Sequence, residues 1–180
     1  MSQSADYSVY ANLVTDRLVL RPPAISDVAT IFFLRTDIIL NQYIKRKPPV
    51  SHQEVEMFIN DRLQDRTNGK AIYWVISTKE APKKCIGSIS LWQFSEDLKT
   101  AEVGYDLHPT YHGNSIMCEA LKAVVQFGAD VLHLDRVEAF THKENKASIR
   151  LLEKNHFTLT NLVDPDVPTN AVYAIQSFGC

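Results

Sequence analysis

Apolar residues spaced three or four positions apart predict about four helices along the chain. The first begins where Ser26 or Asp27 supplies a cap, and the second follows a capping box formed by Ser51 and Glu54. The expected helices span about 26–35, 52–66, 116–132 and 146–154. The apolar face of the second helix consists of Val55, Phe58, Ile59 and Leu63. A strong helical period in the third helix runs through Ile116, Met117, Ala120, Leu121, Val124, Val125 and Gly128.

Runs rich in β-branched and aromatic residues predict strands between and after these helices. They cover 18–20, 71–78, 85–93, 100–107, 136–141, 157–162 and 171–177. The short polar segments 79–84 and 94–99 separate consecutive strands, as antiparallel hairpins require. Later strands alternate with helices. This order predicts an α+β fold in which a mixed, mostly antiparallel twisted sheet of about six or seven strands is flanked by about four helices.

The length of 180 residues fits a single domain, which we place at residues 15–180. The polar residues 1–14 predict a loosely held N-terminal arm before it. Hydrophobic residues make up 45% of the chain and charged residues 22%, so the chain has enough apolar surface to fold unaided.

Charge and cysteine content exclude several classes of function. The net charge of −2 provides no basic field for phosphate backbones, which argues against a nucleic-acid binder. Cys85, Cys118 and Cys180 lie far apart, so we expect neither a disulfide framework nor a zinc site. The six histidines show no metal-ligand spacing, and we expect no metal. The chain shows neither an export signal nor an apolar segment of membrane length, so we expect a cytoplasmic protein without membrane attachment.

The segment from Ala101 to Ser115 carries the clearest candidate chemistry, because a strand runs there through a tight turn into the helix at Ile116. Backbone N–H groups at the start of a helix lack partners within it and lie at the positive end of the helix dipole. The turn therefore predicts a site for a phosphate or pyrophosphate. The donors expected to bind it belong to Gly113, Asn114, Ser115, Ile116 and Met117. Most joints of this kind bind nothing, so the pattern alone leaves a purely structural turn open.

Residues 111–121, Tyr-His-Gly-Asn-Ser-Ile-Met-Cys-Glu-Ala-Leu, resemble the acetyl-CoA-binding turn of the GNAT N-acetyltransferases. The resemblance is closer still to the ribosomal-protein-alanine acetyltransferase subgroup. Three further segments resemble that subgroup in the same order: the opening strand 15–21, the Cys-Ile-Gly-Ser-Ile run 85–89, and the helix 145–157 with its Asn, Ser and Lys. Together they extend the similarity over roughly residues 15–177.

This resemblance implies a GNAT-like fold and transfer of an acetyl group from acetyl-CoA to a primary amine, by direct attack in a ternary complex and without a metal. The implied acceptor is a protein N-terminus or a small amine, and the implied assembly is a monomer or homodimer. By the same resemblance, residues 113–117 hold the pyrophosphate and Asn145 reaches the CoA arm. Ser148 is the implied acid for the departing thiolate, because Leu152 stands where many GNAT members carry a tyrosine. Helix capping is the structural alternative for Asn145 and Ser148.

A protonated amine has no lone pair, so the reaction requires a base, usually acting through water. Glu102 is the first candidate, since strand alternation places it with Asp106 on the face opposite Tyr105. A solvated or salt-bridged strand residue is an equally good interpretation of Glu102. Asp106, Tyr105 and His108 are further candidates for the base. Glu119 lies in the first turn of the long helix, where we expect it to be structural first.

Several residues depart from the family pattern. Thr110 stands where the turn usually begins with Gln or Arg, Asn114 replaces a common basic residue, and Ser115 replaces a second glycine. Ser115 then needs a tolerable φ and adds bulk beside the phosphates. These changes keep a second function open, a non-catalytic acyl-CoA-binding or protein-interaction module. Because His156 replaces the usual glycine before Phe157, Asn155 is expected to be the left-handed helix stop.

Two further features have two interpretations each. Trp92, near a strand end, either packs in the core, as we expect for Trp74, or lines the acceptor side of the site. The basic run Lys45 to Lys47 is either a solvated loop or a border of the acceptor site.

Overall fold

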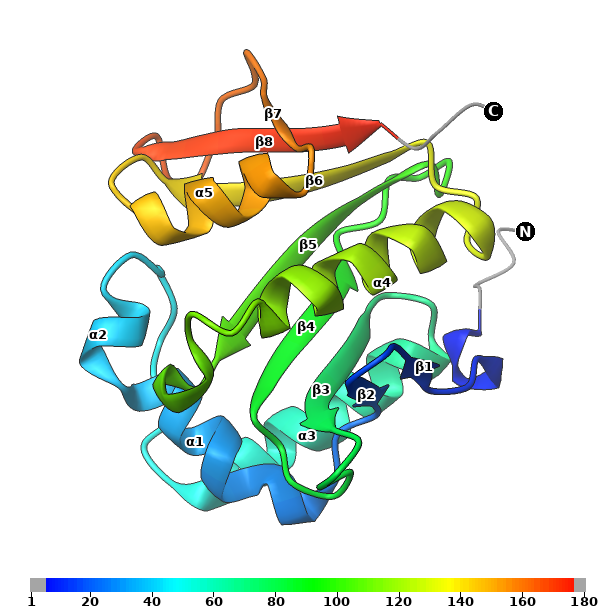
Figure 1. Cartoon of the computed structure of the whole chain (residues 1–180), viewed down its shortest axis with the longest axis vertical. Helices are drawn as coiled ribbons and strands as arrows, with labels where there is room; N and C mark the ends of the chain where they lie inside the picture. The colour runs from blue at the N-terminus through cyan, green and yellow to red at the C-terminus, as the bar shows by residue number, and fades with distance from the viewer. Residues whose placement is uncertain (1–5, 177–180) are drawn as a thin grey trace.

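A mixed sheet of eight strands forms the centre of the molecule, with the order β1-β2-β3-β4-β5-β6-β8-β7 (Figure 1). The computed structural model describes residues 6–176. The strands are β1 Leu13–Val14, β2 Leu18–Arg21, β3 Ile72–Thr78, β4 Gly87–Trp92, β5 Thr100–Leu107, β6 Arg136–His142, β7 Thr158–Leu159 and β8 Asn170–Gln176. Paired strands are antiparallel except β5 and β6, which run parallel.

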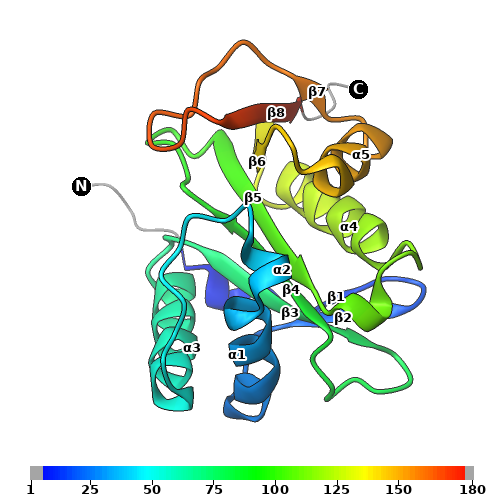
Figure 2. The ribbon, with the colours of Figure 1, turned by 90° about the vertical axis from the view of Figure 1, so that its left-hand side faces the viewer.

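Helices cover both faces of this sheet (Figure 2). On one face lie α1 (Val28–Thr36), α2 (Ile38–Asn41) and α3 (His52–Thr67). On the other face lie α4 (Ile116–Asp130) and α5 (Lys146–Lys154). Short 3-10 segments span Tyr7–Val9, Ile25–Asp27 and Pro109–Tyr111.

Two apolar clusters hold the layers together. In the larger cluster Trp74, which is 1% exposed, packs edge-on against Phe127 of α4 with 5.6 Å between ring centroids. Trp74 is therefore a core residue, as expected. The smaller cluster joins α1 and α3 to β3 through Ile31, Ile59 and Val75. Burial on both faces fixes the sheet between the two helical layers.

The predicted fold class is confirmed, with one strand and one helix more than expected. The additional strand is β1, with two residues, and the additional helix is α2, with four. Both are too short for a hydrophobic period to appear. The strand predicted at 157–162 pairs with β8 only through Thr158 and Leu159. Leu63, predicted to be buried, is 36% exposed, so the apolar face of α3 is narrower than its period suggests.

The predicted left-handed position at the end of α5 is wrong by one residue. Asn155 has a φ of −99°, whereas His156 has a φ of 65°. The Asn155 side chain is buried and its Nδ2 donates to the Leu151 carbonyl at 2.7 Å. Because Asn155 closes the helix with its side chain, the left-handed residue moves to His156.

Residues 6–14 pack against the domain, so the expectation of a loosely held arm over residues 1–14 is wrong for this part. Tyr7 is 4% exposed and belongs to the larger core cluster. Arg66 donates from Nε to the Tyr7 carbonyl at 3.1 Å and from Nη2 to the Tyr10 carbonyl at 2.7 Å. A distant arginine therefore satisfies backbone carbonyls that the local sequence leaves open. Residues 1–5 lie outside the described residues.

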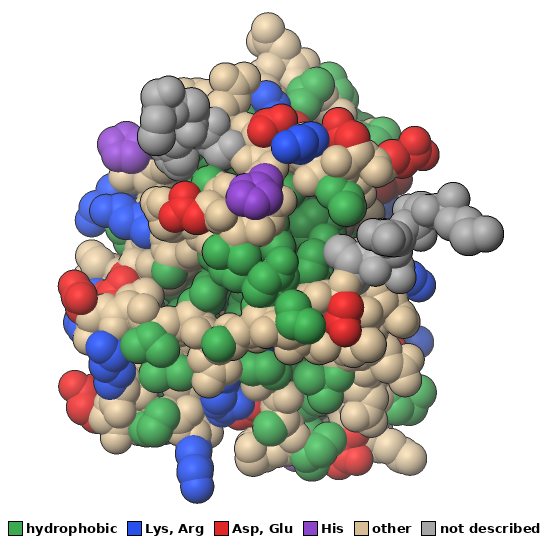
Figure 3. Space-filling model, turned by 90° about the vertical axis from the view of Figure 1, so that its right-hand side faces the viewer, with side chains coloured by type: hydrophobic (Ala, Val, Ile, Leu, Met, Phe, Trp, Pro, Cys, Tyr) green, Lys and Arg blue, Asp and Glu red, His purple; other side chains and the backbone are tan. Residues whose placement is uncertain are grey.

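Charged side chains of both signs are mixed on the surface, and the two cysteines within residues 6–176 are free. On the face shown in Figure 3, Lys and Arg side chains are interspersed with Asp and Glu around an apolar centre. Cys85 and Cys118 are buried free thiols, and Cys180 lies outside the described residues. Among the helices in residues 6–176, none has the length and hydropathy needed to cross a membrane.

A buried ion pair ties the N-terminal part of the fold to the β3–β4 hairpin. Arg21 donates from Nη1 and Nη2 to the two carboxylate oxygens of Asp27, both at 2.8 Å, and Asp27 is 1% exposed. Arg21 also donates to the carbonyls of Pro82 and Lys83, both at 3.0 Å. The pair thus joins β2, the start of α1 and the hairpin loop.

Replacing Asp27 by Asn should lower the free energy of unfolding by about 3 kcal/mol, because it leaves a partly buried guanidinium without its carboxylate. Urea unfolding followed by circular dichroism measures the change. Asp65→Asn is the control, since the Arg62–Asp65 pair within α3 is more exposed than the Arg21–Asp27 pair and should contribute about 1 kcal/mol or less. Equal losses in the two variants would contradict this role for the buried pair.

Candidate functional site

The only parallel contact in the described sheet is short, and the two strands then separate. β5 pairs with β6 at Thr100↔Arg136, Ala101↔Val137 and Glu102↔Glu138. Beyond this point β5 stays paired with β4 as far as Leu107, and β6 stays paired with β8 as far as His142. We call this divergence the β5–β6 fork, formed by residues 103–107 and 139–142. Figure 1 shows it opening toward the side of the molecule where α2 and α5 lie.

The fork exposes backbone groups of both strands. Successive residues of a strand direct their N–H and C=O groups alternately to its two edges. Every second residue of 103–107 therefore turns these groups toward β6 where no ladder pairing is formed. Such donors are available for a ligand that enters between the strands.

The turn after β5 presents the start of α4 without a side-chain cap. Gly113 has a φ of 78°, and a Cβ built on it would meet nothing within 4 Å, so its backbone angle rather than space explains the glycine. Ser115 is left-handed, with a φ of 57°, and makes no cap hydrogen bond. The N–H groups at this helix start thus lack a competing side-chain acceptor. The turn tolerates Ser115 in the conformation that a second glycine would adopt.

Glu119 binds the segment before β2, which in turn contacts the turn before α4. One of its oxygens accepts from Thr15 Oγ1 at 2.5 Å and from the Arg17 N–H at 2.9 Å, and the other accepts from Arg17 Nε at 2.6 Å. Arg17 Nη1 also donates to the Asn114 carbonyl at 3.1 Å. Burial opposes the ionised form, but these hydrogen bonds lower the pKa of Glu119 below its ordinary value. The contacts favour the structural interpretation of Glu119.

Asn145 and Ser148 lie at the start of α5, directly after β6. Asn145 Oδ1 accepts the Ser148 N–H at 3.1 Å, so the capping role of Asn145 is present. The Ser148 hydroxyl lies 2.8 Å from the hydroxyl of Tyr105 on β5. Burial raises the pKa of Tyr105 to about 12, so Tyr105 keeps its proton at neutral pH and acts as a donor more readily than as a base.

Glu102 lies on the opposite face of β5 from Tyr105, at the last paired position before the fork. In the sheet register it lies between Trp92 on β4 and Glu138 on β6. Its side chain has no hydrogen-bond or ion-pair partner within residues 6–176. Burial, with the charges of Asp164 and Glu138, raises the pKa of Glu102 to about 7. Glu102 therefore forms no salt bridge within residues 6–176, and the interpretation of Glu102 as a salt-bridged strand residue is wrong there.

The neighbouring carboxylates are all engaged. Glu138 accepts from Arg136 Nε at 2.7 Å, and Asp106 pairs with Arg46 at 3.2 Å. Asp164 is 7% exposed and accepts three hydrogen bonds, from the Asp166 and Val167 N–H groups and from Asn170 Nδ2.

Of the other base candidates, His108 is also engaged. Its Nδ1 accepts the Thr110 N–H at 3.3 Å, and its ring lies 4.7 Å from that of Phe33. Asp106 is held by Arg46. Glu102 thus differs from His108 and Asp106, because its side chain has no hydrogen-bond or ion-pair partner within residues 6–176.

The segment after α2 bridges the fork, which the periodic pattern did not reveal. Tyr43 stacks on His142 at the end of β6, with 5.2 Å between ring centroids. Lys45 Nζ donates to the Asp166 carbonyl at 3.3 Å, and Arg46 pairs with Asp106 of β5. The basic run of residues 45–47 was the one sequence signal that pointed to this segment. Trp92, 39% exposed beside Glu102, lies on the same face.

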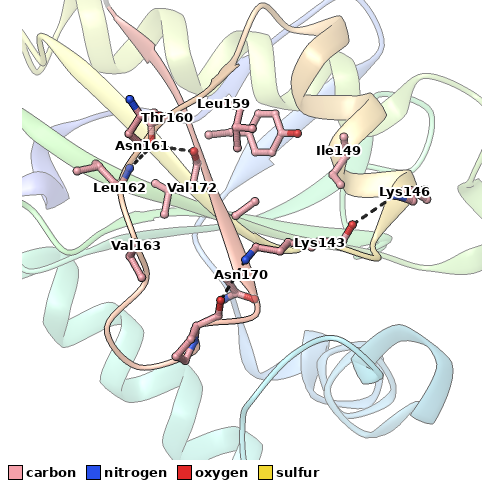
Figure 4. Close-up of a pocket in the computed structure, with 13 residues that line it drawn as sticks. Lys143, Lys146, Ile149, Leu159, Thr160, Asn161, Leu162, Val163, Asn170 and Val172 are labelled. Carbon is pink, nitrogen blue, oxygen red and sulfur yellow. Dashed lines mark hydrogen bonds between the residues drawn. The ribbon is translucent and has the colours of Figure 1, made fainter.

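A separate cavity of about 500 Å³ lies beside α5 (Figure 4). Residues of α5, of β8 and of the segment after β7 line it, with Lys143 and Lys146 among its polar groups. It contains none of the predicted site residues. Of the predicted residues, Glu102 lies on one face of β5 at the β5–β6 fork and Ser148 lies beside Tyr105 on the other face, whereas residues 113–117 form the turn before α4. Within the described residues, no group of three or more His, Cys, Asp or Glu side chains is placed to hold a metal ion.

Comparisons with known proteins identify relatives of this chain. The family model described as "Acetyltransferase (GNAT) domain" matches residues 17–158. The uncharacterized N-acetyltransferase YoaA of Bacillus subtilis (strain 168) is 29% identical over 145 residues, which is 81% of each protein.

Solved structures share the fold. RimL, described as a ribosomal L7/L12 alpha-N-protein acetyltransferase in complex with coenzyme A, superposes with a TM-score of 0.80 and 22% identity, covering 92% of this chain and 98% of RimL. The microcin C7 self-immunity acetyltransferase MccE, in complex with acetyl-CoA and AMP, gives a TM-score of 0.78 and 21% identity, covering 96% of this chain and 99% of MccE.

The pKa of Glu102 should be measurable by NMR titration of its side-chain carboxyl, with an expected midpoint at about pH 7. Glu138→Gln removes a neighbouring negative charge and frees Arg136, so it should lower this midpoint toward the ordinary value of about 4.3. Glu153→Gln, on the exposed side of α5, should leave it unchanged. A midpoint near the ordinary value in the unmodified protein would contradict the environment described for Glu102.

Proposed function

Because the chain belongs to the GNAT acetyltransferase family, we propose that it transfers the acetyl group of acetyl-CoA to a primary amine, which is a protein N-terminus or a small amine. Membership makes the chain an acetyl-CoA-dependent acyltransferase. The observation that carries the proposed reaction is the unpaired Glu102 carboxylate at the point where β5 and β6 separate.

Acetyl-CoA fits the groups around α4 and the fork. In the proposed complex the N–H groups of residues 113–117 bind the pyrophosphate, which the uncapped start of α4 favours. Asn145 uses its Oδ1 as a helix cap, so its Nδ2 is left to donate to the CoA arm. The thioester then lies between β5 and β6, where a backbone N–H of β5 can donate to the carbonyl oxygen as it gains negative charge.

The acceptor amine approaches from the face of β5 that carries Glu102. A base with a pKa near the working pH is ionised often enough to accept a proton and acidic enough to pass it on to solvent. Glu102 therefore takes the proton of the attacking amine, directly or through one water. Trp92 and the Arg46–Asp106 pair border the same face.

In the proposed complex the leaving sulfur is contacted by Ser148, which lies on the opposite face of β5 from Glu102. As the carbon–sulfur bond breaks, sulfur gains an electron pair, and a hydroxyl of Ser148 can donate a hydrogen bond to it. Leu152, at the position where many relatives carry a tyrosine, is fully buried in the core and supplies no donor.

The charge balance favours an acceptor with one ammonium group. Arg136 and Arg46 compensate Glu138 and Asp106, which leaves Glu102 as the unpaired carboxylate. A polyamine would bring further positive charges, whereas Asp106 and Glu138 on this face are already paired with arginines. The described activity of RimL as an alpha-N-protein acetyltransferase supports a protein N-terminus as the acceptor class.

The reaction is tested by release of free thiol from acetyl-CoA with peptides, small monoamines and polyamines as acceptors. We expect turnover with the first two classes and a kcat/KM that rises with pH through a midpoint at about pH 7, because only ionised Glu102 acts as a base. Glu102→Gln should lower kcat by about 100-fold or more and abolish this pH dependence. Glu138→Gln should keep turnover and shift the profile to lower pH.

Two outcomes would contradict the proposal. Near-normal kcat in Glu102→Gln would remove Glu102 as the base. Binding of acetyl-CoA without thiol release from any amine would identify a non-catalytic acyl-CoA-binding module.

Asn145 allows its two roles to be separated. Asn145→Asp keeps a good helix cap but loses the Nδ2 donor, so stability should be retained while the Kd for acetyl-CoA rises about tenfold. Asn145→Ala should raise the Kd as well and also lower the free energy of unfolding by about 1 kcal/mol. Isothermal titration and thermal unfolding measure the two effects. Unchanged affinity in both variants would limit Asn145 to capping.

A further inference from the structure

Tyr105 and Ser148 form the only side-chain hydrogen bond that joins β5 to α5 in the described residues, with 2.8 Å between their oxygens. Each hydroxyl has a single hydrogen, so two arrangements are compatible with this distance. Either Tyr105 donates to Ser148, or Ser148 donates to Tyr105. The two arrangements differ in what Ser148 presents to a ligand.

The surroundings of each hydroxyl bear on this choice. The Ser148 N–H is already bound by Asn145, and Ser148 Oγ has no partner besides Tyr105 within residues 6–176. The buried phenol of Tyr105 has its pKa raised to about 12, so its hydrogen is present throughout the neutral range. A phenol is also a stronger hydrogen-bond donor than an aliphatic alcohol, because it is the more acidic hydroxyl.

We propose that Tyr105 is a positioning residue for Ser148: its hydroxyl donates to Ser148 Oγ, so the one hydrogen of Ser148 is directed to the sulfur of the bound thioester. This inference rests on the proposed function, in which Ser148 meets the leaving thiolate. In the opposite arrangement Ser148 would turn its lone pairs toward sulfur and would oppose the charge that develops there.

The proton balance of the step follows from the acidities. The nitrogen–carbon bond forms and the carbon–sulfur bond breaks, with its electron pair moving to sulfur, while Glu102 takes the amine proton. A thiol is more acidic, at a pKa of about 8.5, than the serine hydroxyl, so Ser148 keeps its proton and acts as a hydrogen-bond donor. The two donors in series polarise each other toward sulfur. The thiolate gains its proton from solvent after release.

The test is a double-mutant cycle on the intact protein with Tyr105→Phe, Ser148→Ala and the combined variant. Single-turnover rates are measured at saturating acetyl-CoA and a fixed amine, together with the Kd for acetyl-CoA and the unfolding midpoint. Tyr105→Phe should lower the rate about tenfold with a Kd within about twofold of the unmodified protein. In the Ser148→Ala background it should have no further effect. Tyr173→Phe, a buried tyrosine of β8, is the matched control and should leave the rate unchanged.

Each alternative result has a distinct meaning. A Tyr105→Phe variant with the normal rate overturns the inference and leaves the proposed function standing. Equal slowing in the Ser148 and Ser148→Ala backgrounds also overturns it, because the effect would not pass through Ser148. If the unmodified protein releases no thiol with any amine, both the proposed function and the inference fail. Should Tyr105→Phe not fold, 3-fluorotyrosine at position 105 keeps the hydroxyl and makes it a stronger donor, so a rate below normal would overturn the inference.

Discussion

The short parallel contact between β5 and β6 is the constraint on which the site depends. Three residue pairs join the strands, and each strand then follows its own antiparallel partner. Because only three residues separate β6 from α5, the divergence also sets where α5 begins. It therefore leaves free edges of two strands beside the start of α5, where Ser148 contacts Tyr105 of β5.

The ion pairs near the β5–β6 fork leave Glu102 without a partner and so allow its pKa to be raised. Arginines hold the carboxylates of Asp106 and Glu138 on the face of Glu102, while three hydrogen bonds hold Asp164. Glu102 is left half-buried, without a partner and near the negative charges of Asp164 and Glu138, which is the combination that raises the pKa of a carboxyl group. A nearby arginine free to approach Glu102 would remove this property. The ion pairs are thus part of the site although they touch no substrate in the proposed complex.

Local sequence predicted the long elements and missed contacts between distant residues. The periods of α3 and α4 and the alternation along β5 were sufficient because burial repeats within each element. The turn at Gly113 was predictable from its position between a strand and a helix. The raised pKa of Glu102 depends on Asp164 and Glu138, and the Tyr105–Ser148 contact joins two separate elements, so no local pattern contains them. Arg66, which fixes residues 6–14, was hidden for the same reason.

A crystal structure of the acetyl-CoA complex would decide whether the β5–β6 fork receives the thioester. We expect pyrophosphate oxygens within hydrogen-bond distance of the N–H groups of residues 113–117 and the thioester carbon between β5 and β6, with its sulfur beside Ser148. Acetyl-CoA bound elsewhere, for example in the cavity beside α5, with the fork free of ligand, would contradict it.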